Sequence, residues 1–110
     1  MHRFYYLDGF EDSENSLPDP KRILHRDNDL PAVIYDIDKK ESEQCLAWYQ
    51  NGKKHRINGP AVINYHLNSE FWYKEGLPHR NDGPARIWHG PGFKIYFKEG
   101  VLCEDRIFKQ

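Results

Sequence analysis

The sequence predicts an all-β protein, an antiparallel meander of tandem β-hairpins. Three observations predict this fold. Aromatic and glycine residues recur with a spacing of 24 residues, the glycines sit where tight turns are needed, and apolar residues alternate with variable ones between the turns. A helical turn is expected only within residues 39–44. The length of 110 residues fits a single domain with one core.

Two regular units define the repeat. The residues W-Y-Q-N-G at 48–52 return as W-Y-K-E-G at 72–76, and Y-F-K-E-G follows at 96–100. His-Arg and then Gly-Pro-Ala come after the first two glycines, ending at positions 61 and 85. Glycine can adopt positive φ at each turn, and each proline suits the start of a strand because it lacks a donor N–H. Each unit is therefore expected to form short strands around a tight turn.

The strand after each Gly-Pro is expected to have two different faces. Ala61 and Ile63 are two residues apart, and so are Ala85 and Ile87. Because side chains alternate along a strand, Ala and Ile should share one face, with the variable residue between them on the other.

The remaining units are degenerate. We treat residues 1–110 as one repeat domain with a first unit at 4–35, a linker at 36–45, regular units at 46–69 and 70–93, and a last unit at 94–110. The first unit carries an insertion at 11–23, which is rich in Asp, Glu, Ser and Pro and is expected to form a long acidic loop. In the last unit, Cys103 stands where histidine is expected. Terminal repeats are often atypical because one of their edges has no neighbour.

The charges are unevenly distributed along a chain whose net charge is only −1. Residues 1–45 contain eleven acids and six bases, a net of −5, and residues 46–110 contain six acids and ten bases, a net of +4. The small total argues against nucleic acid or an anionic membrane as the partner, although basic and aromatic residues do alternate at 53–56 and 94–98. The asymmetry can orient a charged partner.

Two isolated cysteines, Cys45 and Cys103, form neither a disulfide framework nor a zinc motif. A reducing compartment is the simpler interpretation. The first residues lack the pattern of a signal peptide, and no apolar run is long enough to span a bilayer. We therefore expect a cytoplasmic protein.

The repeat resembles the MORN repeat superfamily, in the variant aromatic-aromatic-x-x-G-x-x-H-R-x-x-G-P-A. Residues 48–61 and 72–85 match this pattern fully, and the first and last units match it in part. The resemblance implies a hairpin scaffold used for protein contacts and, in some members, for lipid contacts. The variant is similar to repeats in small phage and large-virus proteins and in antitoxin-like bacterial proteins, which implies an inhibitor or neutralising role.

The His-Arg pairs form two rows, His25, His55 and His79 beside Arg26, Arg56 and Arg80. Such rows could hold a phosphate, a nucleotide or a carboxylate. The alternative is that each pair braces its own hairpin, with His bonded to a turn carbonyl and Arg paired with Glu75 or Asp82 or capping the Gly-Pro turn. We favour bracing, because a group present in every unit usually serves the scaffold.

No pattern in the chain indicates an enzyme, a metal site or a cofactor. His2, His66, His89, Cys45 and Cys103 lack the close spacing of zinc ligands. A phosphate-binding loop is missing, and the paired carboxylates at 11–12, at 36 with 38 and at 104–105 lie in polar stretches rather than in unlike environments. The cysteines are interpreted as small packed thiols.

Recognition is expected to come from residues that do not repeat and from large aromatic side chains. The irregular segments are 11–23, 36–45 and 88–93, and long loops on rigid frames commonly carry recognition. The candidate binding residues are Trp48, Tyr49, Trp72, Tyr73, Trp88, Arg56, Arg80, Glu11, Asp12 and Glu14.

These observations predict a non-catalytic protein-binding module that contacts a protein partner through an aromatic-lined sheet face and the acidic loop. With the resemblance, the expected form is a phage-type inhibitor of a bacterial host protein. Two alternatives stay open, an anion or nucleotide sponge that uses the His and Arg rows, and an antitoxin or immunity protein. Unpaired edge strands also allow a homodimer.

Overall fold

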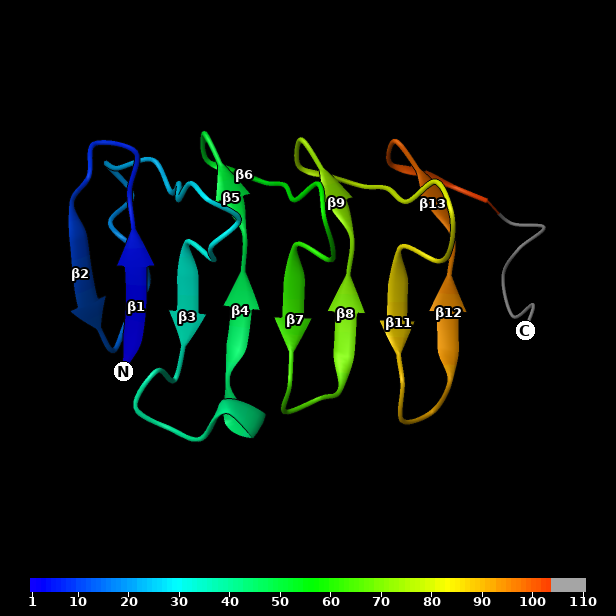
Figure 1. Cartoon of the computed structure of the whole chain (residues 1–110), viewed down its shortest axis with the longest axis horizontal. Coiled ribbons are helices and arrows are strands. Elements are labelled where there is room, and N and C mark those ends of the chain that lie inside the picture. Colours follow the sequence, from blue (N-terminus) through cyan, green and yellow to red (C-terminus); the bar gives the residue numbers. More distant parts are fainter. Residues whose placement is uncertain (104–110) are drawn as a thin grey trace.

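The computed structural model describes residues 1–103 and contains a single long sheet with three small hairpins along one end of its strands (Figure 1). Every neighbouring pair in the sheet is antiparallel. From one edge to the other, the strands are β12 (Phe93–Ile95), β11 (Arg86–Trp88), β8 (Ser69–Phe71), β7 (Val62–Asn64), β4 (Cys45–Ala47), β3 (Val33–Tyr35), β1 (His2–Tyr5) and β2 (Glu11–Glu14). The prediction of an all-β antiparallel meander is confirmed.

The small hairpins are β5 (Tyr49–Gln50) with β6 (Lys53–Lys54), β9 (Tyr73–Lys74) with β10 (Leu77–Pro78), and β13 (Phe97–Lys98) with β14 (Val101–Leu102). One short 3₁₀ turn, Glu41–Glu43, lies inside the range in which a helical turn was predicted. Within the described residues, no helix is long and apolar enough to cross a membrane.

Each small hairpin turns through two residues with positive φ. In β5–β6 these residues are Asn51 (52°) and Gly52 (83°), and Glu75 and Gly76 adopt the same conformation in β9–β10. Two consecutive positive φ angles match the right-handed twist of the flanking strands. Glycine therefore stands at the position where the repeat pattern predicts a turn, and Glu75 occupies a conformation that Asn tolerates better.

The same backbone bonds join each unit to the one before it. The N–H of each turn glycine donates to the carbonyl of the residue that precedes the histidine in the previous unit. The pairs are Gly52 to Leu24 (2.8 Å), Gly76 to Lys54 (2.8 Å) and Gly100 to Pro78 (2.9 Å). The units thus stack with a constant register, as expected of a repeat protein.

The densest packing lies in the first unit. Phe4 and Val33 are almost completely buried, at 0% and 1% exposure, and they cluster with Tyr6 and Ala47. The regular units bury mainly small side chains, among them Ala61 and Ala85, both at 0%. Among residues 1–103, the cluster of buried residues lies around the N-terminal strands, and Trp48 and Ile87 are the large buried side chains of the regular units.

The insertion corrects one expectation. Residues 11–23 were expected to form a loop, but Glu11–Glu14 forms β2, which pairs with all four residues of β1. Arg3 on β1 bonds Glu11 and Ser13 across this pair, and these bonds compensate for the low strand preference of acidic residues. Acidic side chains on an edge strand also discourage further strand pairing.

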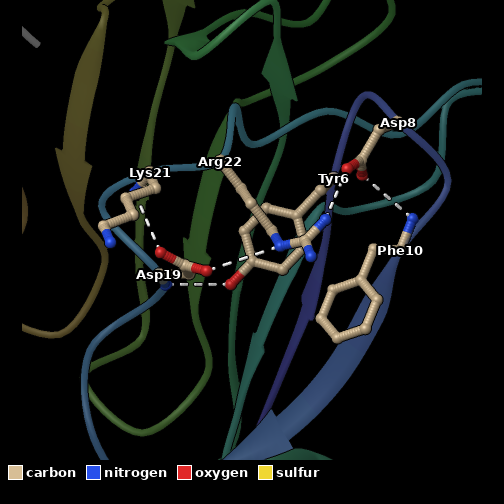
Figure 2. A network of polar contacts seen from close by, with 6 residues as sticks. All are labelled: Tyr6, Asp8, Phe10, Asp19, Lys21 and Arg22. Carbon is tan, nitrogen blue, oxygen red and sulfur yellow. Dashed lines mark hydrogen bonds and ion pairs between the residues drawn. The ribbon is translucent and has the colours of Figure 1, made fainter.

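The rest of the insertion is fixed by a polar network (Figure 2). The guanidinium of Arg22 lies 3.9 Å from the ring centroid of Phe10 and forms ion pairs with Asp8 and Asp19. The backbone N–H of Asp19 donates to the hydroxyl of Tyr6 at 3.0 Å. These contacts hold the returning segment against the first unit.

Candidate functional site: two faces of the sheet

Adjacent aromatic residues of each unit lie on opposite sides of the chain. The indole N–H of Trp48 donates to the carbonyl of Asp29 at 3.0 Å, whereas Tyr49 packs against the core cluster around Phe4 and Ala47. This is the alternation expected along an extended segment. We call the side with Trp48 and Trp72 the groove face and the opposite side the aromatic face.

On the groove face, an arginine of each of the first three units stacks on the leading aromatic ring of the same unit. The distances from guanidinium carbon to ring centroid are 3.7 Å for Arg26 on Tyr5, 3.8 Å for Arg56 on Trp48 and 3.8 Å for Arg80 on Trp72. Each Nη1 also donates to the carbonyl of the proline in its own unit, at 3.1–3.2 Å. The three arginines therefore close the loop between His-Arg and Pro-Ala.

The histidines connect neighbouring units. The Nδ1 atoms of His25, His55 and His79 accept the N–H of Asn51, Glu75 and Glu99, at 3.0, 3.0 and 2.8 Å. A turn carbonyl was the expected partner, so this detail is corrected: the bond is to a turn N–H of the next unit. The His-Arg residues lie outside the strands, and the two residues of a pair line the same hollow, His55 with Arg56 and His79 with Arg80. Their contacts are those of braces.

We call the place where two neighbouring units meet on the groove face a junction. Asp29 lies at the first junction, between the first unit and the unit at 46–69. A hollow of about 400 Å³ lies here, lined in part by Trp48, His55 and Arg56. The carboxylate of Asp29 accepts from Nε and Nη2 of Arg56, at 2.9 and 3.3 Å. Asp27 and Glu75 also line this hollow, which makes it acidic.

The second junction differs because its loop is one residue shorter. Its hollow of about 460 Å³ is lined in part by Trp72, Lys74 and Arg80. Arg80 pairs with the exposed Asp82 at 3.2 Å, one of the alternatives that the sequence left open, and the buried indole nitrogen of Trp72 has no hydrogen-bond partner within residues 1–103. The charge of the groove face therefore changes from acidic to basic along the repeat.

The aromatic face carries the larger apolar surface. Its half-buried rings are Tyr35, Tyr49, Phe71, Tyr73, Trp88 and Phe97. Trp88 packs edge-on against Phe71, with ring centroids 5.1 Å apart. Burial raises the pKa of the Tyr35 and Tyr49 hydroxyls above their usual value, and the neighbouring Cys45, whose thiol pKa is likewise raised by burial, adds to the effect at both.

Two cations stand among these rings. The Nζ of Lys54 lies 5.2 Å from the ring centroid of Tyr73. The guanidinium of Arg86 lies 5.4 Å from the centroid of Phe71 and 5.1 Å from that of Phe97, and its Nη2 is 3.4 Å from the hydroxyl of Tyr73. The C-terminal half of the aromatic face is therefore apolar and cationic together.

The structure divides the predicted site residues between several places. Tyr49, Tyr73 and Trp88 share the aromatic face, whereas Trp48, Trp72, Arg56 and Arg80 share the groove face. The acidic residues of the insertion, Glu11, Asp12 and Glu14, lie on the edge strand β2. A single surface that combines both aromatic rows is not formed.

Other chemical candidates are separated. Within residues 1–103, no group of three or more His, Cys, Asp and Glu side chains is placed to hold a metal ion. Cys45 and Cys103 are free and half-buried. Asp38 pairs with the N-terminal ammonium at 3.3 Å, and its pKa is lowered by backbone hydrogen bonding and by this pair. The carboxylate pair at 104–105, like the end of the last unit, lies outside the described residues.

The predicted binding residues do not include Lys54, Phe71, Arg86 and Phe97, although Lys54 and Phe97 lie in the stretches 53–56 and 94–98 where basic and aromatic residues alternate. A usable signal was present for Arg86, because the corresponding position holds Val62 in the preceding unit and Val33 in the first. A cation at a position that is apolar in the other units departs from the needs of the scaffold. Lys54 stands likewise where the first unit has Leu24, which packs against the core.

No protein-family model, curated protein or solved structure matches the chain. The resemblance to MORN repeats therefore stays a prediction that rests on the motif.

Proposed function

We propose that this protein is a non-catalytic module that binds another protein through its aromatic face. One observation carries the proposal: the six large rings of the aromatic face, which come from the long sheet and its small hairpins, keep part of their surface accessible. Aromatic residues and arginine are enriched at the centres of protein interfaces. The units that present these rings are fixed by repeated backbone bonds, so little ordering is needed on binding.

The competing nucleotide sponge has weaker support. It needs the repeated His and Arg side chains as ligands, but each histidine Nδ1 and each arginine Nη1 already has a partner in the scaffold. A ligand would have to replace these bonds. A set of nucleotides should therefore leave the melting temperature unchanged, and a clear rise would revive this alternative.

The motif resemblance supports a more specific form of the proposal, a phage-type inhibitor of a bacterial host protein. An antitoxin or immunity protein would use the same surface on a partner encoded nearby. Neighbouring genes separate the two: a toxin gene beside this one favours the antitoxin.

Partner capture tests the proposal. A tagged protein should recover one stoichiometric partner from a suitable host, identified by mass spectrometry. Tyr73→Ala and Phe97→Ala remove rings from the aromatic face and should each weaken capture about tenfold or more, the effect of a central interface anchor.

The matched control is Ile57→Ala, because Ile57 is 82% exposed and lines both hollows of the groove face. This variant should capture the partner as the unmodified protein does. If Ile57→Ala abolished capture and the two ring variants retained it, the interface would lie on the groove face and the proposal would be wrong.

A further inference from the structure

Arg86 is exceptional among the described arginines. Arg3, Arg22, Arg56 and Arg80 each pair with a carboxylate, and Arg26 donates to the carbonyl of Pro31. Arg86 has neither kind of acceptor within residues 1–103; its single hydrogen bond goes to the hydroxyl of Tyr73 at 3.4 Å. Its Nε is buried and has no hydrogen-bond partner among the described residues.

An arginine in this state destabilises the free protein. Three rings lie beside the guanidinium, its Nε is buried, and a polar donor removed from water is costly unless it is paired. Cation–π contacts offset only part of this cost. The scaffold does not require the charge, because valine fills the same position in two other units.

No acid of the sheet is placed to neutralise Arg86. The register aligns Arg86 with Phe71, so the neighbouring Glu70 pairs with Ile87 and projects from the opposite face. There the carboxylate of Glu70 binds His89 at 3.3 Å. Lys54, the second cation beside Tyr73, likewise has no ion pair in the described residues.

The groove face indicates what such a guanidinium binds when a partner is supplied. Arg56 also lies against an aromatic ring, and the carboxylate of Asp29 accepts from its Nε and Nη2. The Nε of Arg86 is buried and its Nη2 is held only by a long bond, so a carboxylate of the partner would meet the terminal Nη1 and Nη2 donors of the guanidinium. A planar guanidinium with these donors matches the two oxygens of a carboxylate.

We propose that Arg86 and Lys54, on either side of Tyr73, form a carboxylate-binding site that receives an Asp or Glu side chain of the protein partner. This inference rests on the proposed function and names the chemistry that the aromatic face recognises. An acidic protein segment fits better than nucleic acid, because the site offers only two cations and the N-terminal half of the chain carries a net charge of −5.

The first test uses peptides and the full chain. An acetylated, amidated Glu-Glu-Trp-Glu peptide should shift the Arg86 Nε–Hε resonance in ¹H–¹⁵N spectra, while the Gln-Gln-Trp-Gln peptide should not. Arg86→Val and Arg86→Lys should each reduce the affinity at least tenfold, because the fork of donors is lost. Lys98→Gln is the matched charge control, since Lys98 is exposed and follows Phe97 on the other side of β13; it should change the affinity less than twofold.

Arg86→Val also separates recognition from a structural role. It restores the residue of the other units, so the melting temperature should stay the same or rise while peptide binding is lost. A marked fall in melting temperature would assign Arg86 to the scaffold and overturn the inference. Stronger binding of inorganic phosphate or of a thymidine decanucleotide than of the acidic peptide would overturn it as well.

Partner capture then distinguishes the two proposals. If Tyr73→Ala and Phe97→Ala abolish capture and Arg86→Val leaves it intact, the aromatic face is correct and the carboxylate site is wrong. If all three variants capture the partner normally, the proposed function itself fails. Loss of capture in all three, with the fold retained, supports both.

Discussion

Phe4 and Phe71 lie in one row across the sheet, yet their environments differ. The row runs through aligned residues of neighbouring strands, Phe4, Val33, Ala47, Val62 and Phe71. Phe4 is fully buried, because Tyr6 and Leu24 of the first unit pack around it, while Phe71 is half-exposed. One sheet face thus serves as a core at one end and as an open aromatic surface at the other.

The two ends of the sheet are stabilised in different ways. The first unit has a network around Arg22 and a cluster of large buried side chains. The regular units bury mostly alanine, with Trp48 and Ile87 as their large buried side chains, and they are also held by bonds between units and by stacked arginines. The rings that the regular units place on the aromatic face are only partly buried, so they remain accessible to a partner.

The largest expected effect is the loss of the N-terminal core. Phe4→Ala should lower the free energy of unfolding by about 3–5 kcal/mol, because a fully buried ring leaves a cavity. Phe71→Ala, at the other end of the row, should lower it by roughly half as much. Urea denaturation followed by tryptophan fluorescence measures both. Equal losses of unfolding free energy in the two variants would mean that Phe4 does not lie in a more tightly packed core than Phe71.

Bonds between units are the next test. His55→Ala removes the acceptor of the Glu75 N–H and should lower the free energy of unfolding by about 1–2 kcal/mol. His55→Asn is the matched variant, because its side-chain oxygen can replace Nδ1 and should recover a good part of the loss. If the two variants were equally stable, the histidine would act through packing and not as a hydrogen-bond acceptor.

The repeated part of this arrangement could be predicted from sequence, since each feature has a local cause. Gly52 marks a turn because the turn needs positive φ, and Asp82, two residues from Arg80, was one of the partners named for this arginine. The partner of each histidine was missed, because it belongs to the next unit and depends on how the units stack. Strand β2 was missed for a similar reason: Glu11–Glu14 has poor strand propensity and is held by Arg3.

The candidate site was predicted only in part for a geometric reason. The motif joins Trp48 and Tyr49 in one aromatic pair, but an extended chain sends them to opposite faces. Arg86 becomes notable only when its neighbours are known, because its lack of an acidic partner is a property of the folded sheet.

Alkaline pH tests the aromatic face. Burial raises the pKa of Tyr35 and Tyr49, so the neutral hydroxyl is favoured in the folded state. The resulting stability is fully present below the ordinary pKa of tyrosine, about 10, and is lost as the pH rises through the higher pKa of the folded state. Urea denaturation between about pH 9 and 11.5 should therefore show a decline.

Tyr49→Phe should make this alkaline decline shallower, because the variant has one titrating group fewer. Cys45→Ser is the necessary companion, since burial raises the pKa of the Cys45 thiol as well and this group adds to the decline. A slope unchanged in Tyr49→Phe would indicate that its hydroxyl is as accessible in the folded protein as in the unfolded chain.

The smallest expected effect lies in the turns, and it is stabilising. Glu75 has φ of 50°, a conformation in which Asn51 serves the preceding unit. Glu75→Asn should raise the free energy of unfolding by about 0.5–1 kcal/mol, because Asn tolerates positive φ better than Glu. The reverse change, Asn51→Glu, should lower it by a similar amount, and Lys74→Asn, at a strand position next to the turn, should not stabilise.

The hydrogen bond from the turn N–H to His55 is retained in Glu75→Asn. A gain in stability there therefore reports the backbone conformation of the turn and not the bond between units. Equal stability of the protein and both turn variants would mean that the bonds to the neighbouring unit, and not the turn residue, fix the conformation of the regular hairpins.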